Sequence, residues 1–253
     1  VVSSPLVQVG GLVGTSTNKI AISDSYSTGE VIGSDNTAGL IGIVKQESTI
    51  QRCWSSAEVT STGQRVGGMV GETQAQLTIA DCFSTGNITA NGQQVAGILG
   101  YASQKVIVER CYSTGVITSN TAGTGGIVGT LSGASSEVSD CIAWNENIIC
   151  NRTANNKWAP GAVVGAANTT VTLADCYRRS DMNFYDKAGA MTLSDQDNVT
   201  NAVPPTPAYL DNATQAAYHG KAAGAEETLS QVALRIGWSE DIWDLSGDVP
   251  VLK

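Results

Sequence analysis

A short motif of two apolar residues between glycines recurs along the first two thirds of the chain at nearly constant intervals. Good copies lie at residues 11–14, 39–42, 68–71, 97–100 and 126–129, and a weaker copy lies at 162–165. The closing glycines are separated by 28, 29, 29, 29 and 36 residues. A unit of this length cannot bury its own apolar face, so a fixed period in this range predicts a solenoid in which successive units stack.

Aligned on this period, the units carry like residues at like positions. One column is branched aliphatic: Ile22, Ile50, Ile79, Val108, Val138 and Leu173. Another is mainly aromatic: Tyr26, Trp54, Phe83, Tyr112, Ile142 and Tyr177. Like residues stack on like in parallel, in-register strands. We therefore predict an all-β fold, a parallel β-solenoid (β-helix) of about six 29-residue coils with right-handed crossovers, each coil holding two or three short strands.

The period ends near Tyr177. We expect residues 1–178 to form the solenoid and residues 179–253 to form an irregular C-terminal cap. Within the cap, the pattern predicts one short amphipathic helix near 226–236 and a final strand near 242–252. Because the end of a solenoid is an exposed β edge, we expect the cap to cover the last coil, with Trp238 and Trp243 packing over it.

A third column lies two residues before the aromatic column and one residue before a recurring cysteine, and its charge alternates in sign: Asp24, Arg52, Asp81, Arg110, Asp140 and Asp175. Acid above base gives each charge an opposite neighbour, a pairing that stabilises adjacent strands by roughly 0.2 to 1 kcal/mol. The exception is the step from Asp140 to Asp175, which coincides with the lengthened repeat. A carboxylate row can also serve a metal or a reaction, but interleaved arginines favour a structural ladder of ion pairs.

Five of the six cysteines share one register: Cys53, Cys82, Cys111, Cys141 and Cys176. Stacked coils would place these thiols about 4.8 Å apart, and five members of one column cannot pair off. We therefore expect them to be small buried hydrophobes that belong to the structural ladder. Cys150 lies outside the register, and a disulfide from it to Cys141 or Cys176 stays open.

The composition disfavours several partners. The net charge of −9 argues against nucleic acid and against an anionic membrane surface. No apolar run is long enough for a transmembrane helix. His219, the only histidine, has no Ser, Cys or second His near it and is expected to be a solvated loop residue. We expect no cofactor, no metal site and no catalytic residues in a protein that is a monomer.

The chain opens on Val1 without a methionine or a secretion signal. Two expectations stay open: that residues preceding Val1 are missing, or that residues 1–5 fray. Any signal or anchor would lie outside this stretch.

The fifth unit carries about seven extra residues within an Asn-rich stretch, 145–158. Insertions in solenoids form loops on one face, often the binding face. Indole rings and amide groups suit a sugar-binding surface, so the candidate ligand-binding residues are Trp144, Asn145, Asn147, Asn155, Asn156 and Trp158. The alternative is that Trp144 continues the aromatic column and Trp158 plugs the loop.

The repeated Gly-Leu-apolar-Gly units, each followed by aliphatic-x-x-Cys-aromatic-Ser-Thr-Gly, resemble the GLUG motif of bacterial surface proteins. The segment from Trp243-Asp244 to Pro250-Val251-Leu252 also looks like the ending that follows such arrays. That family includes adhesin-like proteins frequent among gut Bacteroidetes and non-catalytic parts of immunoglobulin A1 peptidases. The resemblance implies a β-solenoid that is extracellular or on the bacterial cell surface, and it suggests adhesion. It supplies no catalytic residues, and the His-Glu-x-x-His peptidase motif is absent.

Three functions follow as hypotheses. The first is a non-catalytic adhesin or binding module, a rigid solenoid that presents a lateral face or the inserted loop to a glycan or a host protein. The second is a structural stalk of a longer surface protein. The third is a polysaccharide-degrading β-helix enzyme, for which Asp140 and Asp175 would be the candidate carboxylates.

Overall fold

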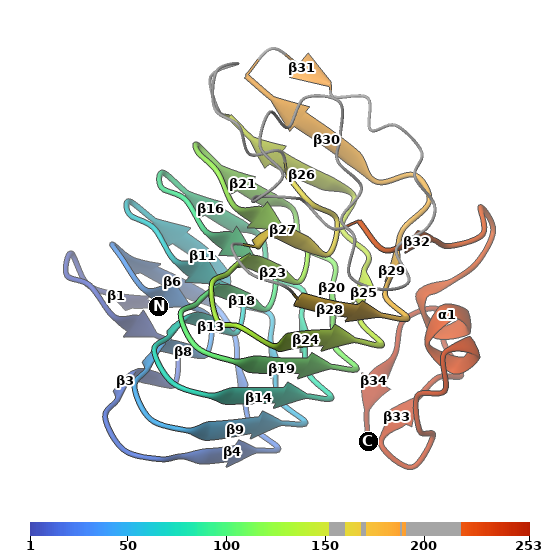
Figure 1. Ribbon diagram of the computed structural model, residues 1–253, viewed down its shortest axis with the longest axis horizontal. Coiled ribbons are helices and arrows are strands. Elements are labelled where there is room, and N and C mark those ends of the chain that lie inside the picture. The colour runs from blue at the N-terminus through green and yellow to red at the C-terminus, as the bar shows by residue number, and fades with distance from the viewer. Residues whose placement is uncertain (152–159, 168–170, 188, 191–218) are drawn as a thin grey trace.

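The computed structural model describes residues 1–151, 160–167, 171–187, 189–190 and 219–253. It confirms a parallel β-solenoid (Figure 1), with five sheets running along the rod and one strand per coil in each sheet. Two sheets have six strands each. One contains β3 (Val13–Ser16), β8 (Ile41–Val44), β13 (Val70–Thr73), β18 (Leu99–Ala102), β23 (Val128–Leu131) and β27 (Val164–Ala167). The other contains β4 (Ala21–Ser23), β9 (Ser48–Gln51), β14 (Leu77–Ala80), β19 (Val106–Glu109), β24 (Ser136–Ser139) and β28 (Val171–Ala174).

A third sheet, called the aromatic sheet below, carries the aromatic column. Its strands are β5 (Tyr26–Ser27), β10 (Trp54–Ser55), β15 (Phe83–Ser84), β20 (Tyr112–Ser113), β25 (Ile142–Ala143), β29 (Tyr177–Arg178) and β32 (Lys221–Ala222). A fourth, short sheet contains β2 (Val9–Gly10), β7 (Thr37–Ala38), β12 (Val66–Gly67), β17 (Val95–Ala96) and β22 (Thr124–Gly125).

The fifth sheet contains β1 (Val2–Ser3), β6 (Glu30–Gly33), β11 (Glu58–Ser61), β16 (Ile88–Ala90), β21 (Ile117–Ser119), β26 (Asn147–Cys150), β30 (Asn183–Asp186) and β31 (Gly189–Ala190). Strands β30 and β32 extend the stacking beyond residue 178, because β30 pairs with β26 and β32 pairs with β29. The pairs are parallel and in register, except that β31 turns back antiparallel on β30.

Each complete coil has five short strands rather than the two or three expected. Two of the breaks between strands fall at corner columns whose residues adopt a left-handed backbone, which interrupts a strand. One corner column is the charged ladder, with φ of 51° at Asp24, 49° at Arg52 and similar values along it. The other corner includes Asn36, Arg65 and Gln94, with φ between 58° and 65°.

The core lies inside the coils and is built from the stacked aliphatic and cysteine columns. Ile79 and Val108 are partners on adjacent coils, and both are fully buried. Cys82 and Cys111 also lie on adjacent coils, since Phe83 pairs with Tyr112 immediately after them. Burial of each such aliphatic side chain contributes about 1.5–3 kcal/mol, which explains why the columns hold apolar residues.

The recurring glycines permit close approach between coils. A Cβ on Gly68 would lie 2.1 Å from both the Gly97 carbonyl oxygen and Oγ of Ser84. No side chain fits in that space, so the first glycine of each motif is a packing requirement rather than a turn.

The C-terminal segment, residues 221–253, contains the helix α1 (Leu229–Arg235) and the antiparallel pair β33 (Trp243–Asp244) and β34 (Val251–Leu252). Thr228 caps the helix, with a capping box to Gln231. Helix α1 and the β33–β34 pair lie beside the aromatic sheet (Figure 1). The expectation that Trp238 and Trp243 cover the last coil is therefore wrong: both indoles pack on the flank, against Tyr112 of the fourth coil.

In the part of the chain that the structure describes, no helix is long and apolar enough to cross a membrane.

Candidate functional site

The charged ladder forms two ion pairs along one corner of the solenoid. Arg52 donates Nε and Nη2 to the two carboxylate oxygens of Asp24, both at 2.7 Å. Arg110 does the same to Asp81, at 2.8 and 3.1 Å. Each arginine thus pairs with the acid of the preceding coil, and the alternation in the sequence corresponds to bidentate contacts.

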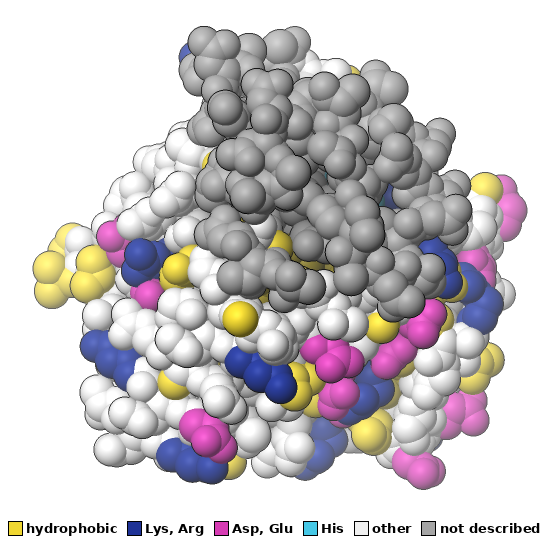
Figure 2. All heavy atoms as spheres, in the orientation of Figure 1, with side chains coloured by type: hydrophobic (Ala, Val, Ile, Leu, Met, Phe, Trp, Pro, Cys, Tyr) yellow, Lys and Arg dark blue, Asp and Glu magenta, His cyan; other side chains and the backbone are white. Residues whose placement is uncertain are grey.

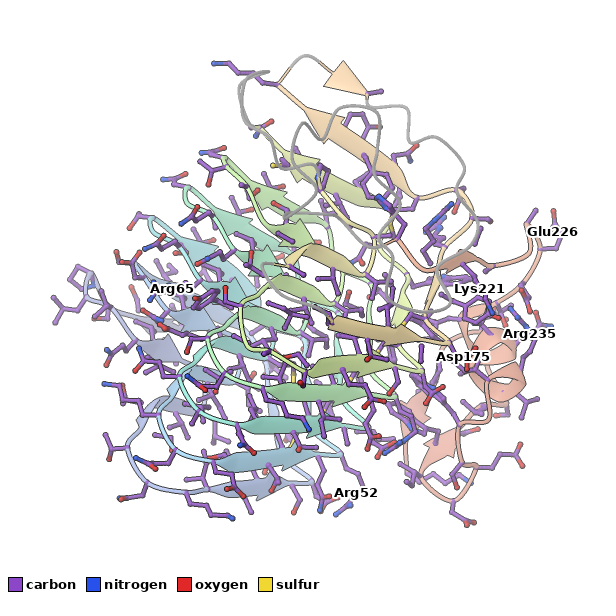
Figure 3. The ribbon with its side chains drawn as sticks, viewed as in Figure 1. Arg52, Arg65, Asp175, Lys221, Glu226 and Arg235 are labelled. Atoms are coloured by element: carbon purple, nitrogen blue, oxygen red, sulfur yellow. The ribbon has the colours of Figure 1, made fainter. Side chains whose placement is uncertain are left out.

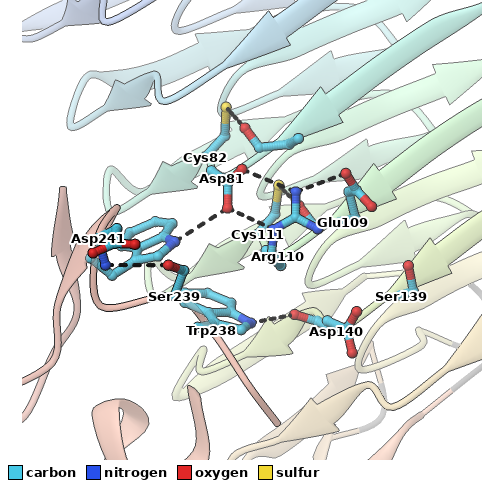
Figure 4. A network of polar contacts seen from close by, with 12 residues as sticks. Asp81, Cys82, Glu109, Arg110, Cys111, Ser139, Asp140, Trp238, Ser239 and Asp241 are labelled. Atoms are coloured by element: carbon cyan, nitrogen blue, oxygen red, sulfur yellow. Dashed lines mark hydrogen bonds and ion pairs between the residues drawn. The ribbon is translucent and has the colours of Figure 1, made fainter. Parts of the chain in front are cut away.

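Asp81 is the centre of a larger network (Figure 4). Besides Arg110, its Oδ1 accepts the indole N–H of Trp243 at 3.3 Å. Arg110 also pairs with Glu109, at 2.8 Å. These contacts join the ladder to the C-terminal segment and are structural.

Asp140 and Asp175 are the like-charged end of the ladder. Burial raises the pKa of the Asp140 carboxyl, and the negative charge of Asp175 raises it further. Asp175 lies 3.7 Å from Nζ of Lys221, a cation from outside the ladder. Figure 3 shows Asp175 and Lys221 together with Arg235 where the solenoid meets α1.

A pocket, called the Trp144 pocket below, opens between the fifth and sixth coils and the C-terminal segment. It has a cavity volume of about 290 Å³. The solenoid contributes Trp144, which follows β25, and residues 179–181, which follow β29. The C-terminal segment contributes Glu227 and Asp248 among others. Trp144 is half-buried, and its backbone N–H donates to the Ser113 carbonyl at 2.8 Å, so the coil holds its backbone in place.

Two carboxylate–guanidinium pairs border this pocket. Arg179 donates to Asp181 at 2.5 and 2.9 Å, and that arginine holds the pKa of the Asp181 carboxyl below its usual value. Glu227 accepts hydrogen bonds from the backbone N–H of Gly224 and from Nε and Nη2 of Arg235, at 2.8 to 2.9 Å. These bonds lower the pKa of the Glu227 carboxyl, and the bond from Gly224 has the largest effect. The Arg235 guanidinium in turn lies 4.4 Å from the centre of the Tyr177 ring.

The other predicted loop residues do not join Trp144 in this pocket. Asn145 is fully buried: its Oδ1 accepts from Ser113 and its Nδ2 donates to the Gly115 carbonyl at 2.6 Å, so its amide is used within the coil. Asn147 lies half-buried in β26. Asn155, Asn156 and Trp158 lie outside the described residues.

The cysteines of the column are buried free thiols. Each donates to a backbone carbonyl two residues earlier, as Cys82 does to Ala80 at 3.1 Å. Burial raises the pKa of Cys82 and Cys111 well above the usual value, so these thiols are poor nucleophiles. Cys150 is also buried, and its Sγ lies 2.7 Å from the Thr121 carbonyl oxygen.

His219 is not the solvated residue that its sequence context suggested. It is buried, its Nδ1 accepts the backbone N–H of Ala162 at 3.3 Å, and its ring meets Phe184 edge-on. Burial, with the charge of Arg178, lowers its pKa to about 3. Among the described residues, no three His, Cys, Asp or Glu side chains are grouped to hold a metal ion.

Sequence reasoning missed a buried glutamate. Glu72 accepts from Arg65 at 2.9 Å, from Gln74 at 3.1 Å and from Asn36. Its partners in the adjacent coils are Ile43 and Tyr101, so Glu72 lies in a column with no other charged residue on the neighbouring coils. The signal was the second corner column, where Asn36 and Arg65 place their polar side chains beside Glu72.

Charge is mixed on the surface as well. On the face seen in Figure 2, acidic and basic side chains lie next to each other over the described coils, and neither sign forms a field of its own.

Comparisons with known proteins give two similarities. A sequence model of the GLUG motif matches residues 6–32, the first repeat. The structure is similar to the crystal structure of a candidate immunoglobulin A1 protease from Bacteroides ovatus, with a TM-score of 0.50 and 16 % sequence identity. The similarity covers 88 % of this chain and 75 % of that protein, and at this identity it shows the fold alone. No curated protein sequence matches the chain.

Proposed function

We propose that this GLUG-motif solenoid protein is a non-catalytic binding module of a bacterial cell surface, an adhesin that presents the Trp144 pocket to a glycan. The observation that carries the proposal is the composition of that pocket. It combines a half-buried indole with the Arg179–Asp181 ion pair and with Glu227, whose carboxylate Arg235 holds from outside the lining.

The chemistry of saccharides fits these groups. The apolar face of a sugar ring packs on an indole, and neighbouring hydroxyls form paired hydrogen bonds with carboxylate and guanidinium groups. A volume of about 290 Å³ lies at the small end of ligand sites, which suits a terminal sugar better than a long chain. Because Asp181, Glu227 and Asp248 outnumber Arg179 in the lining, the pocket favours a neutral saccharide over an anionic one.

The scaffold supports a presenting role. Six stacked coils with a continuous apolar core make a rigid rod, and rigid elements hold a site in place better than loops do. The Trp144 pocket lies on its flank, where a ligand can approach from the side. Surface location agrees with the resemblance to adhesin-like proteins, and a host protein bearing the glycan is the natural partner.

A glycan array probed with the intact protein tests this function. We expect binding to a defined set of neutral saccharides, and at least a tenfold loss of affinity in Trp144→Ala and in Arg179→Ala. Leu234→Ala, an exposed change on α1 away from the pocket lining, is the matched control and should bind as the parent does. Absence of any saccharide ligand, or binding that Trp144→Ala leaves unchanged, would contradict the proposal and favour the stalk.

One observation favours an enzyme as the second candidate. Burial and the neighbouring Asp175 raise the pKa of the Asp140 carboxyl, and a carboxyl with a raised pKa is what the general acid of a glycosidase requires. Neither residue lines the Trp144 pocket. If the protein releases reducing sugar from a polysaccharide and Asp175→Asn abolishes that release, the protein is an enzyme and the proposal of a non-catalytic binding module is wrong.

A further inference from the structure

The flank of the solenoid carries the same arrangement of side chains twice. In the third and fourth coils, the Asp81–Arg110 ion pair lies next to the parallel rings of Phe83 and Tyr112, whose centres are 4.9 Å apart. In the first and second coils, the Asp24–Arg52 ion pair lies next to Tyr26 and Trp54, stacked at 4.6 Å and 5°. The repetition follows from the two-coil period of the charges combined with the one-coil period of the aromatic column.

The copy in the third and fourth coils is occupied by the protein's own C-terminal segment. The indole of Trp243 lies 6.1 Å from the ring of Phe83 and 6.0 Å from that of Tyr112, and its N–H donates to Asp81. The Tyr112 hydroxyl donates to the backbone carbonyl of Pro250 at 2.8 Å. This contact shows what the arrangement binds: a tryptophan on a two-stranded β-hairpin, β33 and β34, held by one side-chain and one backbone hydrogen bond.

The copy in the first and second coils is open. Tyr26 is 61 % exposed, and the side chains of Asp24 and Arg52 are 60 % and 37 % exposed, against 8 % for the side chain of Asp81. Trp54 occupies the position of Tyr112, and its indole N–H has no partner among the described residues, so it can replace the Tyr112 hydroxyl as donor. Figure 3 shows Arg52 at the lower edge of the rod.

The two copies form one continuous surface. The Trp54 ring stacks on Phe83 at 5.7 Å and 4°, so the open aromatic pair directly extends the pair that Trp243 covers. A ligand on the open copy would therefore lie alongside the C-terminal segment and extend an interface that already exists.

We propose that the first two coils form a docking site for a tryptophan-bearing β-hairpin of a partner protein. The indole of the partner packs against Tyr26 and Trp54 and donates to Asp24, while Trp54 donates to a backbone carbonyl of the partner. A second copy of this chain is the weaker candidate, because its own Trp243 is fully buried and engaged. The site is separate from the Trp144 pocket, three coils away, and does not depend on the proposed glycan function.

The test uses the intact protein and a synthetic peptide that copies residues 241–252, Asp-Ile-Trp-Asp-Leu-Ser-Gly-Asp-Val-Pro-Val-Leu. We expect saturable binding by calorimetry, and at least a tenfold loss in Asp24→Ala and in Trp54→Ala. A peptide with phenylalanine in place of its tryptophan should also bind at least tenfold more weakly. Glu58→Ala, an exposed change in β11 of the same coil, is the control and should bind as the parent does.

Four outcomes would overturn the proposal. They are no peptide binding, peptide binding that Asp24→Ala and Trp54→Ala leave unchanged, self-association of the protein that Asp24→Ala abolishes, and saccharide binding that Trp54→Ala abolishes. The second would mean that the peptide displaces the C-terminal segment, the third that the occupant is another copy, and the fourth that the rings bind sugar.

Discussion

The indole N–H of Trp243 donates to Oδ1 of Asp81 over a separation of 162 residues, at 3.3 Å. Two further bonds, from Tyr112 to Pro250 and from Trp238 to Asp140, join the same parts of the chain. The C-terminal segment is thus bound to the side of the rod through a few polar contacts around buried indoles.

Replacing Trp243 by alanine should loosen this segment without unfolding the coils. The indole is fully buried, and its loss should cost about 3–5 kcal/mol, whereas Trp243→Phe should cost about 1–2 kcal/mol because it removes mainly the hydrogen bond. Urea denaturation measures both, and limited proteolysis should release the segment from Trp243→Ala first. Leu234→Ala, exposed on α1, serves as the control. A parent-like midpoint in Trp243→Ala would refute this account.

The two ladder pairs should differ in their contribution to stability. Arg110→Ala leaves the buried Asp81 carboxylate without its cation, at an expected cost of about 2–4 kcal/mol. Arg52→Ala breaks the same geometry between exposed groups and should cost under about 1 kcal/mol. The free energies of unfolding from urea titration test the difference. Equal losses in the two variants would mean that burial does not control the strength of the ladder.

The cysteine column should be inert in the folded protein. Burial raises the pKa of Cys82, Cys111 and Cys141, and the thiolate is the form that reacts. We expect alkylation by iodoacetamide to be slow at pH 7 and to accelerate little by pH 9, while the urea-unfolded protein reacts promptly. Peptide mapping identifies the labelled thiols. Rapid native labelling of any member of the column at pH 7 would show that the coils open locally.

His219 should make the fold sensitive to acid. Its pKa falls from 6.5 to about 3 on folding, so between these values the unfolded chain binds a proton that the native protein does not. The His219 contribution is therefore fully present above pH 6.5 and is lost as the pH falls, by up to about 1.4 kcal/mol per pH unit. The midpoint of urea denaturation, followed from pH 7.5 to 4, should fall more steeply in the parent than in His219→Asn. Parallel profiles would contradict the buried, neutral state of this histidine.

The stacked columns were predictable because each column has a member in five or six of the sequence repeats. Ile79, Cys82 and Phe83 each have equivalents in neighbouring units, so an error at one position could not hide the pattern. The ion pairs of the ladder followed from alternation in the same way, and the structure adds the bidentate geometry of Arg52 and Arg110.

Features that occur once were not predictable. Neither His219 nor Glu72 recurs in a neighbouring unit, and the contacts that bury them come from residues distant in the sequence, such as Ala162 for His219 and Asn36 for Glu72. Trp243 was expected to pack over the end of the rod because a β edge needs cover, yet its indole packs on the stacked rings of Phe83 and Tyr112 on the flank. Among the described residues of the candidate loop, only Trp144 lines the pocket, since Asn145 satisfies its amide inside the coil.

The alternation of acid and base also restricts how an array of this kind can change length. Between Asp24 and Asp140, deleting one coil would bring two acids or two bases into contact, whereas deleting two adjacent coils would restore an opposite pair at the junction. Duplication of coils is restricted in the same way, so arrays of this kind should gain and lose coils in pairs.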